Sequence, residues 1–488
     1  MRFWLTLLAA LTLWSCDSFN GNGPIAVAVI GERDSLFQQG VRLPFGAQHV
    51  RAATNEGLVA LDPAGQVVPA LAERWIVTED GMSYIFRLRE SNWPDGEPIT
   101  ATDVRQLLRE AIARLRGTSL GLDLGTIRDV RAMTGRVIEV RLTAPMPDFL
   151  RLMAQPELGL SKSGGGTGPM ALSRDENNPQ ASLAALPPET RGLPAREDWQ
   201  DVARPVSARA LPARAAVEAF SRGDVDLVLG GTLADFPLAE AGPLSRGTIQ
   251  VDPAIGLLGL VVLREEGLLA DPARREALSM AIDRDALMQP FGLRGWRATS
   301  WIVPPDLYPT PPYADDRWQG ASLDARRQTA AARVRSWTAQ SGRDPVLRVA
   351  LPPGPGSEML LRQLVENWGA IGVTIKRVQS GEKAELELRD TLARYTSPRW
   401  YLNQFHCSLK ASLCSREADA LVRQALTERD PAARDLLLID AHAALVEREV
   451  FIPLGAPVRW SLVRGSITNY VANPWGLHPL FPLSQPTT

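Results

Sequence analysis

Apolar residues recur along the chain with two different periods, which predicts a mixture of strands and helices. Segment 83–89 alternates polar and apolar side chains, as a strand with one buried face does. Segment 257–263 is apolar throughout, which indicates a buried strand and a candidate crossover between two lobes. After Thr100, apolar residues recur at helical spacing, and Asp103 completes a capping box with Thr100. The first half of the chain therefore predicts an α/β fold.

The second half predicts a strand–helix–strand unit followed by a pair of helices. Segments 346–351 and 373–378 have the composition of strands, and 358–371 between them is an amphipathic helix. Further along, the pattern predicts helices at 417–427 and 431–449 and one strand over 451–463. From 174 to 214 the chain is rich in proline, alanine and polar residues, so we expect surface loops with short elements there.

Length and charge narrow the class of protein. The 488 residues exceed the usual size of a domain with one core, so we expect two or three lobes. Lys and Arg total 53 against 55 Asp and Glu, without a basic block, which argues against a nucleic-acid partner. The four histidines are far apart and belong to no nucleophile or zinc motif. The sequence therefore predicts no enzyme, metal site or cofactor.

The N-terminal residues 1–16 have the pattern of a secretory signal. A basic start is followed by an apolar run over 3–13, which is too short to span a bilayer. The tetrapeptide Leu-Trp-Ser-Cys that ends at Cys16 resembles a lipobox, in which the cysteine becomes the lipid-carrying first residue of the mature protein. An ordinary cleaved signal and an uncleaved anchor are the alternatives. Residues 17–24 follow as a polar tether, so we expect a periplasmic protein held at the cell membrane.

Two further cysteines remain if Cys16 carries lipid. Cys407 and Cys414 have six residues between them, and in an oxidising compartment this favours a local disulfide. Two free thiols are the main alternative. A zinc site that adds His406 is the other, although its ligand spacing is not a standard one. The disulfide predicts a rigid loop close to the binding site discussed below.

Four short motifs occur in a fixed order along the chain. They are PALAERW at 69–75, WPDGEPITATDV at 93–104, GTGP at 166–169 and REALSMAIDR at 275–284. The ordered series resembles the signature of family-5 extracellular solute-binding proteins, which include dipeptide-, oligopeptide- and nickel-binding proteins. With weaker matches between them, the resemblance covers about residues 25–470.

The resemblance implies a two-lobed α/β periplasmic binding fold, with an extra subdomain inserted in the first lobe. A hinge joins the lobes, which close on a ligand held in the cleft between them. The expected boundaries are 25–258 for lobe I with its subdomain at about 48–160, 259–464 for lobe II, and 465–488 for a return to lobe I.

The resemblance also implies a function. Members of the peptide/nickel type are the ligand-capturing components of ABC importers, so we expect a monomer that delivers a small solute to a membrane permease. A non-transport envelope sensor, or a degenerate binding protein of the same fold, is the alternative.

One departure from the family pattern bears on the ligand. Peptide-binding members often carry Ala-Asp-Tyr-x-Asp-Pro-x-x-Phe-Leu, whose first aspartate pairs with the ammonium group of the ligand. The matching stretch 393–402 has Arg394 and Ser397 at the two aspartate positions. A guanidinium repels an ammonium group and suits carboxylate or phosphate, so we expect an anionic or neutral ligand.

Two alternatives to this interpretation stay open. Arg394 points to solvent or pairs with Asp390 in the first, and a shifted register makes Asp390 the anchor in the second. Trp475 is a candidate for the wall of an apolar pocket. The candidate ligand-binding residues are Arg394, Tyr395, Ser397, Trp400, Asp390 and Trp475.

Overall fold

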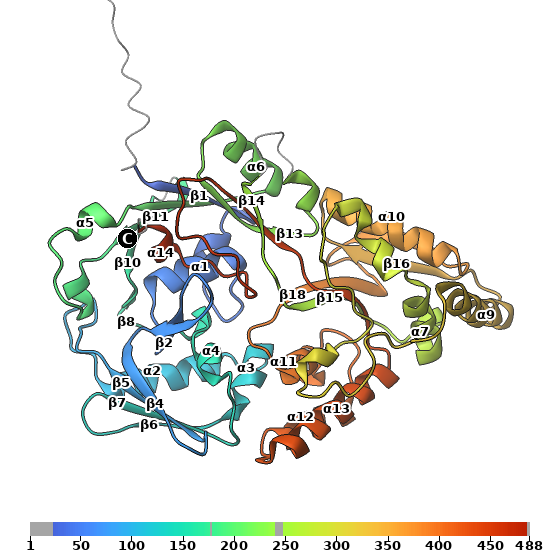
Figure 1. Cartoon of the computed structure of the whole chain (residues 1–488), viewed down its shortest axis with the longest axis horizontal. Coiled ribbons are helices and arrows are strands. Elements are labelled where there is room, and N and C mark those ends of the chain that lie inside the picture. Colours follow the sequence, from blue (N-terminus) through green and yellow to red (C-terminus); the bar gives the residue numbers. More distant parts are fainter. Residues whose placement is uncertain (1–22, 176–177, 240–246, 486–488) are drawn as a thin grey trace, which may run out of the picture.

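The computed structural model describes residues 23–175, 178–239 and 247–485 (Figure 1). The expected signal segment, the lipid-carrying Cys16 and most of the tether lie outside the described residues. Within the described ranges, no helix is both long and apolar enough to cross a membrane.

Lobe I is built on a seven-stranded sheet with β1 (Ile25–Ile30) at its centre. Val27 and Val29 pack in one core with Val50 and Ala53 of α1 (Phe45–Thr54). Ala28 packs on the opposite face with α6 (Ala213–Arg222). Both faces of β1 are therefore covered by helices, which explains why its sequence is apolar without alternation. On one side of β1 lie, from the edge inward, β10 (Met170–Asp175), β11 (Asn178–Ala185) and β12 (Val206–Leu211). On the other side lie, outward from β1, β13 (Leu227–Thr232), β20 (Arg459–Val463) and β14 (Ile249–Val251).

The expectation of surface loops over 174–214 is wrong in part. β12 pairs in parallel with β1, and β11 pairs with β12, so this region supplies two strands of the main sheet. Ala181 and Ala208 are fully buried there. Small residues give a weak strand signal, and here the neighbouring strands decide the conformation.

The inserted subdomain is a four-stranded antiparallel sheet covered by α2 (Ala101–Arg114). Its strands are β4 (Ala72–Val77), β5 (Ser83–Leu88), β7 (Val137–Leu142) and β6 (Ile127–Ala132). The predicted start of α2 is confirmed, because the Thr100 hydroxyl accepts a hydrogen bond from the main-chain N–H of Asp103 at 3.1 Å. Within the subdomain α3 (Ser119–Asp123) connects α2 to β6, and after β7 the chain leaves through α4 (Phe149–Met153) and the 3₁₀ turn η3 (Pro156–Leu158).

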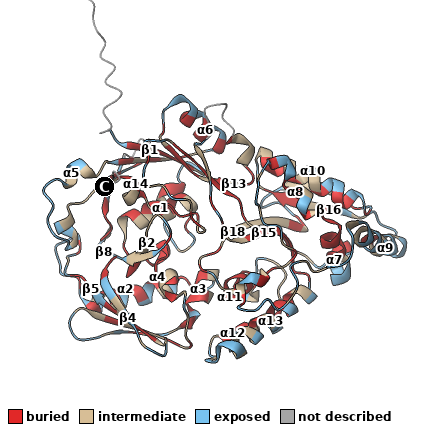
Figure 2. Ribbon diagram, viewed as in Figure 1, coloured by how far each residue is buried: buried red, intermediate tan, exposed pale blue. Residues whose placement is uncertain are grey.

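Lobe II is built on a five-stranded sheet. Its strands in order are β17 (Thr374–Gln379), β16 (Val346–Leu351), β18 (Leu386–Leu392), β15 (Gly256–Val262) and β19 (Phe451–Gly455). The predicted strand–helix–strand unit is confirmed, since α10 (Pro355–Gly369) joins the parallel strands β16 and β17. Helices complete the lobe: α7 (Pro272–Ala281), α9 (Leu323–Ser341), α11 (Pro398–Asn403), α12 (Arg416–Ala425) and α13 (Pro431–Glu447). Figure 2 shows that buried residues follow the strands of both main sheets.

The chain crosses between the lobes twice, and one crossing differs from the prediction. Segment 451–463 forms two strands in different sheets rather than one, with β19 in lobe II and β20 in lobe I. Pro457 lies between them, and a proline has no N–H to continue a strand ladder. The chain is therefore back in lobe I by Arg459 rather than 465, and lobe II begins at Gly256, the start of β15, rather than 259.

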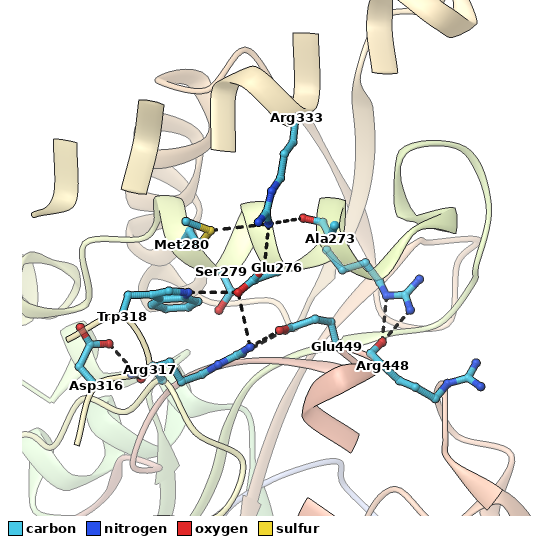
Figure 3. Close-up of polar contacts among 12 residues, drawn as sticks. Ala273, Glu276, Ser279, Met280, Asp316, Arg317, Trp318, Arg333, Arg448 and Glu449 are labelled. Carbon is cyan, nitrogen blue, oxygen red and sulfur yellow. Dashed lines mark hydrogen bonds and ion pairs between the residues drawn. The ribbon is translucent and has the colours of Figure 1, made fainter. Parts of the chain in front are cut away.

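A cluster of buried and half-buried charged side chains ties the helices of lobe II together (Figure 3). The Arg317 guanidinium pairs with both oxygens of the Glu449 carboxylate, one of them at 3.1 Å. Glu276 accepts hydrogen bonds from Trp318 Nε1 at 3.2 Å and from Arg333 at 2.7 Å. The ring of Trp318 lies 5.0 Å from the Arg317 guanidinium. These contacts connect α7, α9 and the end of α13.

Candidate functional site

A cavity of about 300 Å³ lies between the lobes. Lobe I contributes Phe45 and Gln48 of α1, Thr232 of β13 and the segment around Gln155. Lobe II contributes the end of β18 and the residues that follow it, from Asp390 to Arg394, together with Trp400 and Gln404 of the α11 region. The volume is at the lower end of the range for ligand pockets. The cavity therefore suits one small molecule that contacts both lobes.

Arg394 lies in this cleft and pairs with Glu157 of the opposite lobe. Its two terminal nitrogens are 2.8 and 3.0 Å from the two carboxylate oxygens, and it also donates to Gln155 Oε1 at 2.8 Å. Burial opposes the charge of the guanidinium, but the charge and hydrogen bonds of Glu157, together with the charge of Asp123, raise the pKa of Arg394 above its ordinary value. The acid that Arg394 meets is thus Glu157 in place of Asp390.

Asp390 is engaged by a different arginine. Its Oδ1 accepts from Nη1 of Arg459 at 2.6 Å, and its main-chain oxygen accepts from Nη2 at 3.3 Å. Burial raises the pKa of Asp390, although Arg459 acts in the opposite direction. Since Arg459 begins β20 in lobe I and Asp390 belongs to β18 in lobe II, this pair also joins the two main sheets.

Two tryptophans predicted from the sequence line the cavity. Trp400 is 1% exposed, and Trp475 lies under the guanidinium of Arg151, 4.1 Å from the ring centroid. The backbone of Gly65 approaches Trp475 so closely that a Cβ would lie 2.4 Å from the ring. Gly65 also has a φ of 74°, so both its conformation and its contact favour glycine. The ring of Trp475 is thereby held in a fixed position at the cavity wall.

Tyr395 and Ser397 do not line the cavity. The Tyr395 hydroxyl is 2.9 Å from Asp123 Oδ1, and the Ser397 hydroxyl accepts from the main-chain N–H of Arg399 at the start of α11. Asn403 Nδ2 donates to the same Asp123 oxygen at 2.7 Å, and Arg399 donates to the Asp123 main-chain oxygen at 3.0 Å. We call Asp123, Tyr395, Arg399 and Asn403 the Asp123 cluster. It connects α3 of lobe I to α11 of lobe II.

Three important partners escaped the sequence analysis: Asp123, Glu157 and Arg459. None belongs to the motifs that resemble the family, and each meets its partner across the lobes. Glu157 and Arg394 are 237 residues apart in the chain. The sequence carries only one signal for them: a charged side chain placed in a cleft needs a partner of opposite charge, which predicts that such a partner exists but not which residue it is.

Cys407 and Cys414 are bonded to each other, with their Cα atoms 5.2 Å apart. The loop that they close begins at the 3₁₀ turn η10 (Cys407–Leu409). Its main chain is tied to α12, because the Cys407 N–H donates to Asp419 Oδ2 at 3.1 Å. Residues of this loop face the same cleft as Arg394.

Comparison with known proteins identifies the family. The sequence model of bacterial extracellular solute-binding proteins, family 5 Middle, matches residues 66–192 and 193–408. The chain is 24% identical to the probable di/tripeptide-binding protein 5 of Pseudomonas aeruginosa (strain UCBPP-PA14), over 84% of this chain and 86% of that protein. It is 25% identical to the nickel-binding periplasmic protein of Escherichia coli (strain K12), over 59% and 57% of the two chains.

Solved structures show the same fold. The crystal structure of Haemophilus influenzae OppA in complex with the peptide RPPGFSPFR superposes with a TM-score of 0.77, at 16% identity, over 94% of this chain and 98% of that one. The two-lobed architecture predicted from the sequence is therefore confirmed. Because the family model spans most of the chain, the protein belongs to family 5 of the bacterial extracellular solute-binding proteins, the class that supplies the substrate-binding components of ABC importers.

Proposed function

We propose that the protein captures a small neutral or anionic solute, lacking a free ammonium group, and passes it unchanged to an ABC permease. The observation that carries this proposal is the pairing of the carboxylates. Asp390 is the one acidic side chain among the described residues that line the cavity, and Arg459 already pairs with it. Glu157, just behind the lining, is paired with Arg394. To gain an acidic partner in the cleft, an ammonium group has to break one of these partly buried pairs.

The remaining lining residues fit a solute with an apolar body and neutral polar groups. Phe45, Trp400 and Trp475 provide apolar surface, while Gln48 and Gln404 provide amide donors and acceptors. A few fixed polar groups on apolar walls are typical of small-molecule pockets. The peptides named for the relatives are therefore not the ligands that we expect here.

Dipeptides with free amino groups are expected to bind at least about tenfold more weakly than their N-acetylated counterparts, because Arg394 and Arg459 already pair with the two carboxylates and leave no acid for the ammonium group. Titration calorimetry on a matched panel measures the ratio. Arg394→Asp places an acid where the family carries one and is expected to reverse the preference. Arg335→Asp, on the exposed face of α9, is the control and should leave the ratio unchanged. Tight binding of free dipeptides by the wild type, weakened or unchanged in Arg394→Asp, contradicts the proposal.

We also propose that residues 1–16 are a lipoprotein signal, that Cys16 carries lipid, and that the protein acts as a periplasmic monomer at the cell membrane. The support is the short apolar run before Cys16 and the polar residues after it. Cys16→Ser is expected to release the protein from the membrane fraction and to abolish palmitate labelling. The double variant Cys407→Ser/Cys414→Ser keeps Cys16 and is expected to remain membrane-bound. Equal fractionation of Cys16→Ser and the wild type would falsify the lipid anchor.

A further inference from the structure

We propose that the cleft contains a second compartment, beyond Arg394, that binds a carboxylate or phosphate group of the solute. This inference rests on the proposed function and narrows the ligand from neutral or anionic to anionic. It is carried by a hollow of about 500 Å³ on the far side of the Arg394–Glu157 pair, which we call the cationic hollow.

The cationic hollow is formed by both lobes and adjoins the cavity. Lobe I contributes residues 41–43, 118–120 and Glu157, and lobe II contributes Arg389, Arg394, Gln404 and residues 409–411. Ser119, Arg394 and Gln404 line both spaces. A solute that fills the cavity can therefore extend past Arg394 into the cationic hollow, and both lobes enclose it when they close.

The charges around the cationic hollow are strongly unbalanced. Four cationic side chains line it, Arg42, Arg389, Arg394 and Lys410, against one carboxylate, Glu157. Arg394 already uses that carboxylate. The side chains of Arg42 and Lys410 form no ion pair or hydrogen bond with any residue that the structure describes. The cationic hollow thus has a positive charge that no acid among its described lining residues neutralises.

Arg389 adds a half-buried positive charge to this wall. Its guanidinium donates to the main-chain oxygens of Gln404 at 3.1 Å and Ala411 at 3.3 Å. Main-chain oxygens satisfy the N–H groups but do not cancel the charge. Burial lowers the pKa of Arg389, with Glu387 acting in the opposite direction, so the charged form is partly desolvated. An anion in the cationic hollow relieves this cost.

The disulfide fixes the outer wall of the cationic hollow. Lys410 lies inside the loop closed by Cys407 and Cys414, and Leu409 and Ala411 on either side of it also line the space. Because the disulfide closes the loop, the ammonium group of Lys410 is held near the arginines, and less conformational entropy is lost when an anion binds. Planar guanidiniums beside a point charge suit the oxygens of carboxylate and phosphate.

The test uses titration calorimetry on the mature protein with four anions: inorganic phosphate, glycerol 3-phosphate, succinate and citrate. Glycerol and succinamide are the neutral analogues. At least one anion is expected to bind about tenfold more tightly than its neutral analogue, because each hydrogen bond to a charged group contributes more than a neutral one. Binding is expected to weaken when ionic strength rises from about 0.01 to about 0.15 M, which shortens the Debye length from roughly 30 to 8 Å.

Two double variants with the same change of net charge locate the effect. Arg42→Gln/Lys410→Gln removes the two unpaired cations and is expected to weaken anion binding about tenfold. Arg335→Gln/Lys383→Gln removes two exposed cations outside the cleft, and the affinity for the anion is expected to stay within about twofold of the wild-type value. Equal losses in both variants would mean that only the overall charge attracts the anion, and would overturn the inference.

The remaining outcomes separate this inference from the proposed function. If N-acetylated dipeptides or other neutral solutes bind while no anion binds more tightly than its neutral analogue, the cationic hollow is not an anion site and the proposed function stands. If free-amine dipeptides bind most tightly of all, both the proposed function and this inference are wrong. Phosphate and carboxylate ligands are told apart by which probe binds.

Discussion

Glu449→Ala is expected to lower the free energy of unfolding by about 3–5 kcal/mol, because it leaves the buried guanidinium of Arg317 without its partner. Glu449 is 3% exposed and the Arg317 side chain is 9% exposed. The next acid, Glu276, is 3.9 Å from Arg317 and already accepts hydrogen bonds from Arg333 and Trp318. It therefore replaces Glu449 poorly. Equilibrium denaturation by urea, with the midpoint and slope compared with the wild type, measures the loss.

A second variant separates the ion pair from the packing around it. Glu449→Leu/Arg317→Met removes both charges and keeps most of the volume, so it is expected to lose much less than Glu449→Ala. Glu73→Ala breaks an exposed pair, in which the side chains of Arg87 and Glu73 are 44% and 40% exposed, and is expected to cost at most about 1 kcal/mol. A loss in Glu449→Ala as small as that in Glu73→Ala contradicts the prediction.

The sequence predicted local structure best where one short segment carries its own signal. The capping box at Thr100 set the start of α2, and the alternation over 83–89 set β5. The strand over 451–463 was misassigned because both of its halves are buried, and hydropathy does not record that they join different sheets. β12 was missed because its burial depends on β1, which precedes it by more than 170 residues.

For the site too, local features could be predicted from the sequence, whereas contacts between distant segments could not. The position of Arg394 was predictable, since it comes from the register of a family motif. Its pairing was not, because Glu157 lies in the other lobe and in a turn without a motif. The same holds for Arg459 with Asp390. Sequence analysis thus located one side of the cleft, and the fold was needed to supply the other.

Asp123→Asn is expected to change how stability depends on pH. Burial raises the pKa of Asp123 from 3.8 to about 6, against the opposing effects of Arg399, Asn403 and Tyr395. Oδ2 of the carboxylate has no hydrogen-bond partner among the described residues. The folded protein therefore binds the Asp123 proton more tightly than the unfolded chain does. Its contribution to stability is full below about pH 3.8 and is lost as the pH rises to about 6.

The size of the effect follows from the shift. A difference of about two units between the pKa of Asp123 in the folded and unfolded states changes the free energy of unfolding by roughly 3 kcal/mol, as an upper bound. Asparagine keeps the oxygen that accepts from Tyr395 and Asn403 but cannot ionise. The free energy of unfolding of the wild type is thus expected to fall relative to that of Asp123→Asn between pH 4 and 6, and then to run parallel to it up to pH 7. Urea unfolding of both proteins across this range measures the difference, in which other titrating groups cancel.

A matched control has the opposite sign. The hydrogen bond from Arg131 lowers the pKa of the exposed Asp129, so the wild type is expected to gain slightly over Asp129→Asn as the pH rises. Parallel curves for the wild type and Asp123→Asn refute the prediction. Because Asp123 belongs to lobe I and the other members of the Asp123 cluster to lobe II, the same proton also favours the arrangement of the lobes in which the Asp123 cluster is formed. Small-angle scattering of the wild type should then show a smaller radius of gyration near pH 5 than at pH 7, and Asp123→Asn should not.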